Sequence, residues 1–222
     1  MAQGVTTRPP REPDGLWVEV RIDATLVEWF NEMARPEDIA TVTVEDVDLL
    51  QHITAGRRQV TFTSVEEAES LVPEWADRMD MIGYELEAWP TTPAAEQADP
   101  LGAVQRLREV GQAHGLPVAL RLGRRFAAAY SAELAARVDL VILQTQRLQD
   151  NPAALSGFAA PTVETIRRVN PHLEIAVQVR SELDPDQLLV LLDPLRDDLD
   201  GISTVYYSPA TMASARAFVD RL

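Results

Sequence analysis

Two glutamates separated by one residue are the side chains of this sequence best suited to chemistry. Glu85 and Glu87 end the segment Asp80-Met-Ile-Gly-Tyr-Glu-Leu-Glu87. On a β-strand, residues two apart share a face, with Cα atoms about 6.5 Å apart. Carboxylates this close repel, so one keeps its proton to a higher pH than a free glutamate, as a general acid requires. We expect one of these two glutamates to act as general acid/base and the other as its electrostatic partner.

Polar side chains at alternate positions of other apolar runs are expected to join this pair. Side chains of a strand alternate between its two faces, so an apolar outer face places the polar residues in a common interior. Trp89 lies just beyond Glu87, and two tyrosines end the last β-like run, so aromatic rings could form a platform for a ligand. We place Tyr206 with the two glutamates in the catalytic set. The expected substrate-binding residues are Glu19, Arg21, Trp89, Arg121, Gln144, Gln146, Gln178, Arg180 and Tyr207.

Eight short β-like runs, separated by amphipathic stretches, must position these residues. The runs are Trp17 to Ile22, Thr41 to Val44, Gln59 to Thr63, Met81 to Glu87, Pro117 to Leu122, Leu140 to Gln146, Glu174 to Arg180 and Ile202 to Tyr207. Helix signals lie between them, such as Gly115 after an amphipathic stretch and Asp184-Pro185 before another. This alternation predicts a parallel sheet, and eight units predict a single compact (β/α)8 barrel of the TIM type. We expect the barrel over residues 16–222 and a flexible tail over residues 1–15.

The predicted barrel has a polar and charged lumen, whereas TIM barrels are filled mainly by Val, Ile and Leu. Burying unpaired charges costs several kcal/mol each, so such a set persists only if its members pair or if the cavity is wet. One interpretation is a structural network that plugs the barrel. The other is a pocket at the carboxyl ends of the strands, favoured by the positions of Glu87, Gln146 and Arg180 at the ends of their runs.

Other segments carry weaker expectations. We expect Trp17, Trp29 and Trp75 in the core between helices and sheet. The proline-rich stretch 90–100 is expected to be a stiff loop at the rim, and the stretch 146–162 is long enough for a lid.

The Glu-x-Glu segment resembles the strand-four signature of family 18 glycoside hydrolases, the chitinase-like barrels, which reads DxxDxDxE. Asp80 matches the first aspartate and Glu87 the terminal glutamate, while Glu85 takes the place of the middle aspartate and Gly83 that of the second. The resemblance implies that Glu87 is the general acid/base that protonates the glycosidic oxygen, and we expect Glu85 to be its electrostatic partner. It also implies an aromatic floor from the last strand, which Tyr206 or Tyr207 could supply. Barrels of this kind that only bind ligands are known as well.

Two other classes of function stay open. Arg121, Arg124 and Arg125 lie around the end of the fifth run and Arg180 ends the seventh, so they could clamp a carboxylate or phosphate. With a glutamate base, such a site suits a lyase, isomerase or cyclase acting on an acidic metabolite. The second alternative is a non-catalytic barrel-fold binding protein.

Composition excludes several kinds of chemistry. Among 222 residues, the 20 basic side chains are all arginine and 35 are acidic, which gives a net charge of −15. The lack of lysine and cysteine excludes lysine Schiff bases, lysine-held pyridoxal phosphate, thiol nucleophiles and cysteine-ligated zinc. The negative charge disfavours binding to nucleic acid or to anionic membranes. No apolar run reaches the length of a membrane span. We expect a cytoplasmic protein that binds a small molecule or saccharide without cofactor or metal, and assign no oligomeric state.

Overall fold

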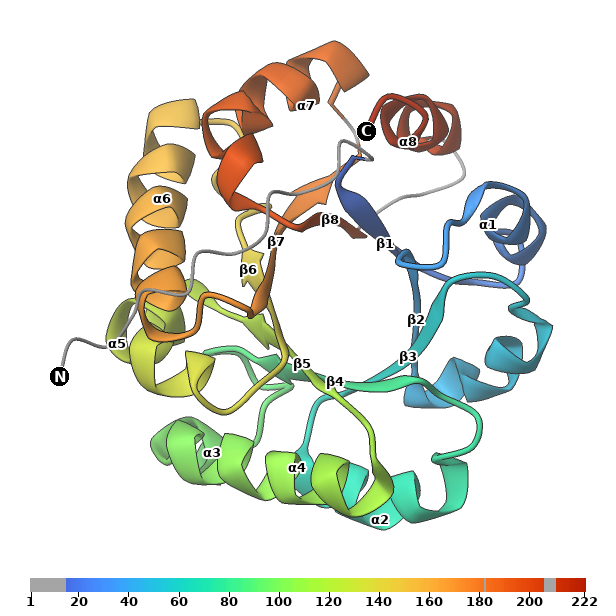
Figure 1. Ribbon diagram of the computed structural model, residues 1–222, viewed down its shortest axis with the longest axis vertical. Helices are drawn as coiled ribbons and strands as arrows, with labels where there is room; N and C mark the ends of the chain where they lie inside the picture. The colour runs from blue at the N-terminus through green and yellow to red at the C-terminus, as the bar shows by residue number, and fades with distance from the viewer. Residues whose placement is uncertain (1–14, 182, 206–210) are drawn as a thin grey trace, which may run out of the picture.

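A computed structural model describes residues 15–181, 183–205 and 211–222, and its strands form one closed barrel (Figure 1). Each strand pairs in parallel with the next, and β8 pairs with β1. The strands are β1 (Trp17–Arg21), β2 (Ile39–Thr43), β3 (Arg57–Phe62), β4 (Met81–Leu86), β5 (Val118–Leu122), β6 (Leu140–Gln144), β7 (Glu174–Arg180) and β8 (Gly201–Val205). Each overlaps one of the eight predicted runs, so the predicted (β/α)8 barrel is confirmed. Of the expected flexible tail, residues 1–14 lie outside the described residues.

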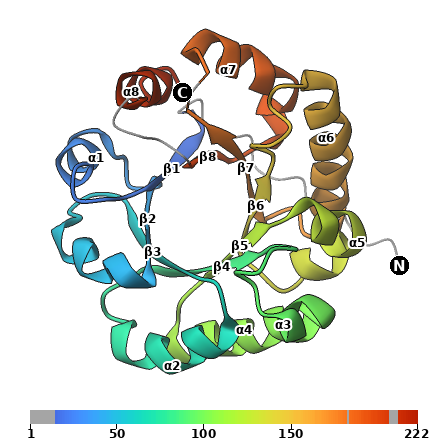
Figure 2. The same cartoon turned by 180° about the vertical axis from the view of Figure 1, so that it is seen from behind.

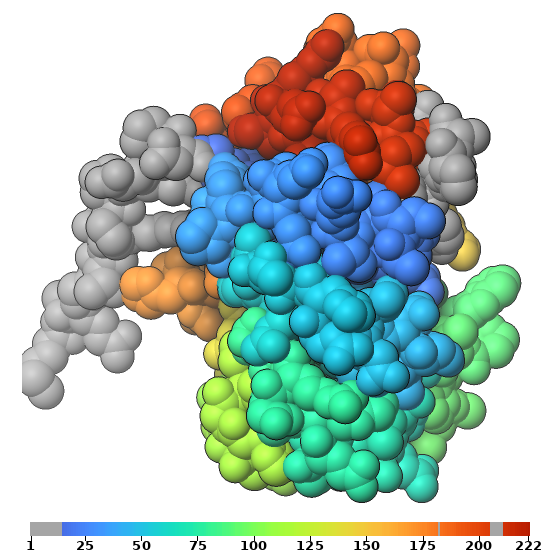
Figure 3. All heavy atoms as spheres, turned by 90° about the vertical axis from the view of Figure 1, so that its right-hand side faces the viewer, coloured from blue at the N-terminus to red at the C-terminus, as the bar shows by residue number. Residues whose placement is uncertain are grey.

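Helices cover the outside of the ring on all sides, as the two end-on views show (Figures 1 and 2). The α-helices are α1 (Val27–Met33), α2 (Val65–Trp75), α3 (Ala94–Ala98), α4 (Pro100–His114), α5 (Arg124–Ala135), α6 (Pro152–Val169), α7 (Pro185–Leu192) and α8 (Met212–Val219), and two 3₁₀ helices are η1 (Val44–His52) and η2 (Asp193–Asp198). The last helix lies beside the first (Figure 3), where the Arg216 guanidinium is 5.4 Å from the Trp29 ring centroid. The outer layer therefore closes along with the sheet.

The predicted helix signals act as expected, but two loop predictions are wrong. The Asp184 side chain accepts hydrogen bonds from the first amides of α7, and Gly115 ends α4 in the left-handed conformation at φ 68°. The expected rim loop contains the short helix α3. The expected lid is largely the first half of α6, because Leu155 and Ala159 recur one turn apart and are buried against the barrel.

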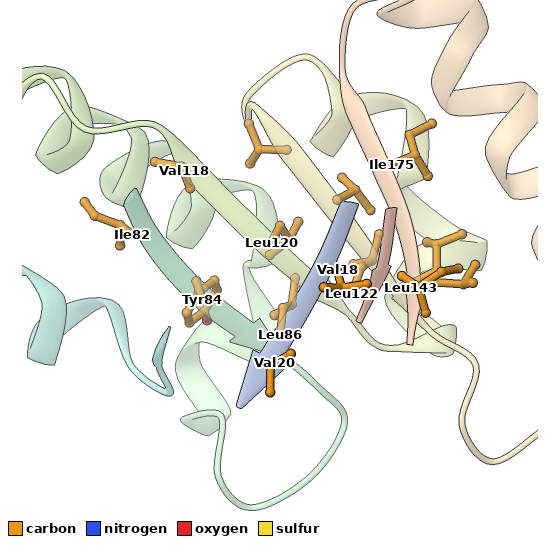
Figure 4. Close-up of a cluster of buried hydrophobic side chains, with 14 of the residues drawn as sticks. Val18, Val20, Ile82, Tyr84, Leu86, Val118, Leu120, Leu122, Leu143 and Ile175 are labelled. Atoms are coloured by element: carbon orange, nitrogen blue, oxygen red, sulfur yellow. The ribbon is translucent and has the colours of Figure 1, made fainter. Parts of the chain in front are cut away.

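The outward faces of the strands form the main core. Val18 and Val20 on β1 and Ile82, Tyr84 and Leu86 on β4 are buried in one cluster with residues of the surrounding helices (Figure 4). These are the apolar members of the alternating runs. The polar members between them consequently face the lumen, as predicted from the period-two pattern.

The floor of the lumen, at the amino ends of the strands, is apolar. Its layer consists of Trp17, Ile39, Met81, Ala119, Leu140, Ile142 and Ala176. The expectation that Trp17 lies between helices and sheet is therefore wrong. The indole fits inside the ring because the neighbouring strand has a glycine, Gly201, whose Cβ atom, if present, would lie 2.1 Å from the indole. The guanidinium of Arg57 lies 5.5 Å from the Trp17 ring centroid and pairs with Glu174. The predicted polar lumen thus begins only above this floor.

Aspartates close the floor in a repeating pattern. Each of Asp38, Asp80, Asp139 and Asp200 precedes an even-numbered strand and accepts a 2.8 Å hydrogen bond from a backbone N–H near the start of the preceding strand. The donors are Val18, Arg58, Val118 and Ile175. These bonds satisfy amides at the barrel end that the strand ladder leaves open.

Within the described ranges, none of the helices combines the length and apolar character needed to cross a membrane.

Candidate functional site

A buried hydrogen-bond network fills the middle of the lumen. Glu19 is fully buried, and its Oε1 accepts from Arg121 Nη2 at 2.6 Å and from Gln59 Nε2 at 2.8 Å. Gln59 Nε2 also lies 3.0 Å from Thr41 Oγ1 and 3.1 Å from Thr61 Oγ1. Arg121 reaches β8 through Ser203, at 3.3 Å. This layer matches the structural plug, so Glu19 and Arg121, expected to bind substrate, are bonded to each other instead of lining an open space.

The same network explains the glycine in the acidic motif. A Cβ atom at Gly83 would lie 2.6 Å from Thr61 Oγ1 and 2.8 Å from Gln59 Nε2. An aspartate there would displace both side chains. Asp80, at the first motif position, lies on the floor and pairs with Arg58. Only Glu85 and Glu87 of the four motif positions belong to the upper lumen.

The two glutamates lie at the carboxyl end of β4, above the plug. Glu85 is in register with Arg121 on β5. Burial raises the pKa of the Glu85 carboxyl above its ordinary value, the Arg121 guanidinium opposes this rise, and the Glu87 carboxylate adds to it. Gln144 Nε2 donates to Glu87 Oε1 and lies 3.4 Å from Glu85 Oε1. The predicted carboxylate pair therefore exists as two side chains joined by one amide.

A cavity of about 170 Å³ opens beside Glu87, at the carboxyl ends of β4, β5 and β6. Its lining residues are Glu87, Ala88, Trp89, Gly123, Arg124, Arg125, Gln144, Gln146 and Arg147. Glu87, Trp89, Gln144 and Gln146 are the members of the predicted site that the structure brings together here. Pockets for drug-sized ligands span about 300–1,000 Å³, so this one suits a small ligand or one end of a larger one.

The loop that carries Glu87 and Trp89 is held by side chains that the sequence analysis did not single out. Thr92 is 1% exposed, and its Oγ1 donates to the Glu85 carbonyl at 2.9 Å and accepts from the Glu87 amide at 3.1 Å. Gln97 Nε2 donates to the carbonyls of Trp89 and Thr92. The backbone on both sides of the Glu87 side chain is thus fixed before any ligand binds.

Trp89 is 54% exposed, as expected of a platform, but one side chain lies against its ring. The Arg147 guanidinium lies 5.6 Å from its ring centroid, in range of a cation–π interaction. Arg147 was missed in the sequence. A signal was present, because Arg147 is the third residue after β6 as Trp89 is the third after β4.

The remaining predicted residues lie away from the cavity. Arg21 is exposed at the end of β1, and Arg180 pairs with Asp150 at 3.1 Å. Gln178 is buried beneath the mouth, and its Oε1 has no hydrogen-bond partner in the described part of the chain. Tyr206 and Tyr207 lie outside the described residues.

The charge around the cavity favours an anion over a metal cation. Three arginines and one glutamate line it. Over the described ranges, no group of three or more histidine and carboxylate side chains is arranged to hold a metal ion.

Comparisons with known proteins identify the fold. No protein-family model matches the sequence, and no curated protein matches it. Among solved structures, a chitinase from Chromobacterium violaceum ATCC 12472 is similar, with a TM-score of 0.60 over 92% of this chain and 99% of that chain. The two sequences are 10% identical, so the similarity shows the fold alone. The chain has a barrel like that of a chitinase, which agrees with the resemblance at its fourth strand.

Proposed function

We propose that the protein binds a small hydroxylated molecule or saccharide at the carboxyl face of the barrel and acts on it like a glycoside hydrolase. The observation that carries this proposal is that Glu87 lines a cavity together with Trp89, Gln144 and Gln146. Catalytic sites of TIM barrels lie at this face. The similar chitinase structure supports a saccharide as the class of ligand to test first.

The proposed roles follow from which carboxylate meets the cavity. Glu87 lines it, whereas Glu85 is not among the lining residues and is held behind Glu87 through Gln144. Glu87 donates its proton to the glycosidic oxygen as the bond to the anomeric carbon breaks, and it recovers a proton from the water that attacks this carbon. Glu85 acts through the charge that it places beside Glu87.

A second candidate is lyase or isomerase chemistry on an acidic metabolite. It is favoured by Arg124 and Arg125, which line the cavity beside Glu87. Arg121 and Arg180, also considered for this role, are paired with Glu19 and Asp150. Product analysis separates the two functions, because only hydrolysis takes up water.

Replacing Glu87 with glutamine tests the proposal. Turnover of a panel of 4-nitrophenyl glycosides and chitin oligosaccharides should fall at least about 100-fold, the usual contribution of a general acid. The melting temperature should stay unchanged, because Glu87 is not part of the buried network. Glu74→Gln, on the exposed side of α2, is the matched control and should keep full activity. Retained turnover in E87Q would exclude the mechanism, and ligand binding without turnover in the wild type would identify a binding protein.

A further inference from the structure

We propose that the cavity recognises an anionic group, a carboxylate or phosphate, at the amino end of α5, so that the ligand is an acidic saccharide and not a neutral one. The site consists of Arg124, Arg125 and Arg147 with the first amides of α5. The saccharide part of this inference rests on the proposed function. The anionic part rests on separate observations.

The three arginines differ from most others in the barrel. Arg124, Arg125 and Arg147 are exposed around one cavity, and none of them forms an ion pair with any residue that the structure describes. The only lining carboxylate within the described ranges is Glu87, and it accepts from Gln144. In a chain with a net charge of −15, this concentration of positive charge in a concave wall attracts anions to one place.

The start of α5 adds backbone donors to this positive wall. The 12-residue helix begins at Arg124, its N-cap Gly123 provides no side-chain cap, and its first turn has no acidic residue. The first amides of a helix have no partner within the helix, and they carry partial positive charge. Gly123 packs so closely on β4 that a Cβ atom would lie 3.0 Å from the Leu86 carbonyl. The helix therefore starts directly beside Glu87, and no side chain of the helix caps its first amides.

An unpartnered side chain on the same wall gives an independent sign of a ligand. Gln146 is 6% exposed and lines the cavity, and its buried Oε1 has no hydrogen-bond partner among the described residues. A buried acceptor left unsatisfied costs about 1–3 kcal/mol. A hydroxyl group of the ligand would satisfy it. Arginines, helix amides and a buried acceptor around one cavity match a molecule that carries both an acid group and hydroxyl groups.

The arginines also have suitable geometry for an acid group. A guanidinium presents donors in a fixed planar fork that binds a carboxylate or phosphate through two bonds. Arg147 rests against the Trp89 ring and Arg125 lies 5.7 Å from the Phe126 ring centroid. Both are thereby restrained without losing charge to an acidic partner.

Binding of matched sugars, measured by calorimetry, tests the inference. The probes are glucuronate, glucose 6-phosphate and glucose. At least one acidic probe should bind about tenfold tighter than glucose, with an affinity that falls as salt rises. Arg125→Gln and Arg147→Gln should each weaken its binding about tenfold and change glucose binding by a much smaller factor. Arg196→Gln, an exposed arginine of η2 near the floor, is the matched control and should change neither.

Each outcome decides the inference. Preference for glucuronate identifies a carboxylate ligand and preference for glucose 6-phosphate a phosphate ligand, and both support it. Equal affinity for glucose, or full affinity in both arginine variants, overturns it. If no sugar binds, inorganic phosphate is the fourth probe: binding that R125Q removes retains the anion site while the saccharide proposal fails, and no binding overturns both. If E87Q keeps its turnover while these affinities are as expected, only the hydrolytic mechanism is excluded.

Discussion

The floor and the mouth of the lumen belong to the same ring of strands, yet they treat charge in opposite ways. On the floor, an apolar layer around Trp17 is surrounded by guanidinium–carboxylate pairs such as Arg57–Glu174 and Arg167–Asp200. At the mouth, the cavity arginines have no carboxylate partner within the described chain, and the Oε1 atom of Gln146 accepts no hydrogen bond there.

The difference separates what stabilises this barrel from what is left for a ligand. A buried polar group without a partner destabilises the folded state. The floor pairs its charged groups with one another, whereas the mouth retains arginines without an acidic partner and a buried amide oxygen in a place that a ligand can reach. Substitutions on the floor should therefore reduce stability, and loss of charge at the mouth should not.

Gly201→Ala is expected to have the largest effect on stability. The added methyl group would overlap the Trp17 indole, with 2.1 Å between Cβ and the nearest ring atom, so the floor must repack. We expect a loss of about 3 kcal/mol in the free energy of unfolding, measured by urea denaturation. Gly157→Ala is the control, because nothing lies within 4 Å of the added Cβ on α6, and it should stabilise by about 0.5–1 kcal/mol. Equal effects of the two changes would show that the floor is not tightly packed.

Asp200→Asn is expected to have the next largest effect. Asp200 is 2% exposed, accepts from the Ile175 amide at 2.8 Å and pairs with Arg167. Removing its charge should lower the free energy of unfolding by about 2 kcal/mol, because the guanidinium loses its partner. The exposed neighbour Asp197 offers the control Asp197→Asn, which should stay within about 0.5 kcal/mol of the wild type. A thermal scan showing both variants unchanged would contradict the role of the floor pairs.

Glu85→Gln should give the smallest change, with the opposite sign. Because burial raises the pKa of Glu85 in the folded state, folding favours its protonated form. The stability that this provides is complete below the ordinary pKa of glutamate and is lost as the pH rises through the raised value. E85Q should therefore match the wild type in acid and become modestly more stable toward neutral pH.

Urea denaturation between pH 4 and pH 8 measures this difference. Glu32→Gln, on an exposed position of α1, should show no such pH dependence. A variant E85Q less stable than the wild type at neutral pH would mean that the mouth, like the floor, needs its carboxylates for folding.

Local patterns in the sequence were sufficient to predict the barrel and, with the exception of Trp17, the faces of the alternating strand residues. Ile82, Tyr84 and Leu86 alternate with Gly83 and Glu85, and the structure buries the first set outside the ring. The lid prediction failed because prolines and a glycine in 146–162 outweighed the helical spacing of its apolar residues, which tertiary packing then used in α6.

Partners across the lumen could not be predicted. Glu19 and Arg121 are separated by 102 residues, and both were expected to bind substrate because they share the interior with Glu85. Thr92 had no strand pattern to mark it, since it lies in a loop whose path depends on contacts with other parts of the chain.

The sequence by itself determined that acidic, amide and guanidinium side chains point into a ring of eight strands, because the alternation of faces is a property of each strand alone. Only the tertiary structure decided which of them pair and which remain for a ligand. That choice depends on the register between strands, which brings Arg121 to Glu19 and leaves Glu87 beside an open cavity, and no single segment contains this information.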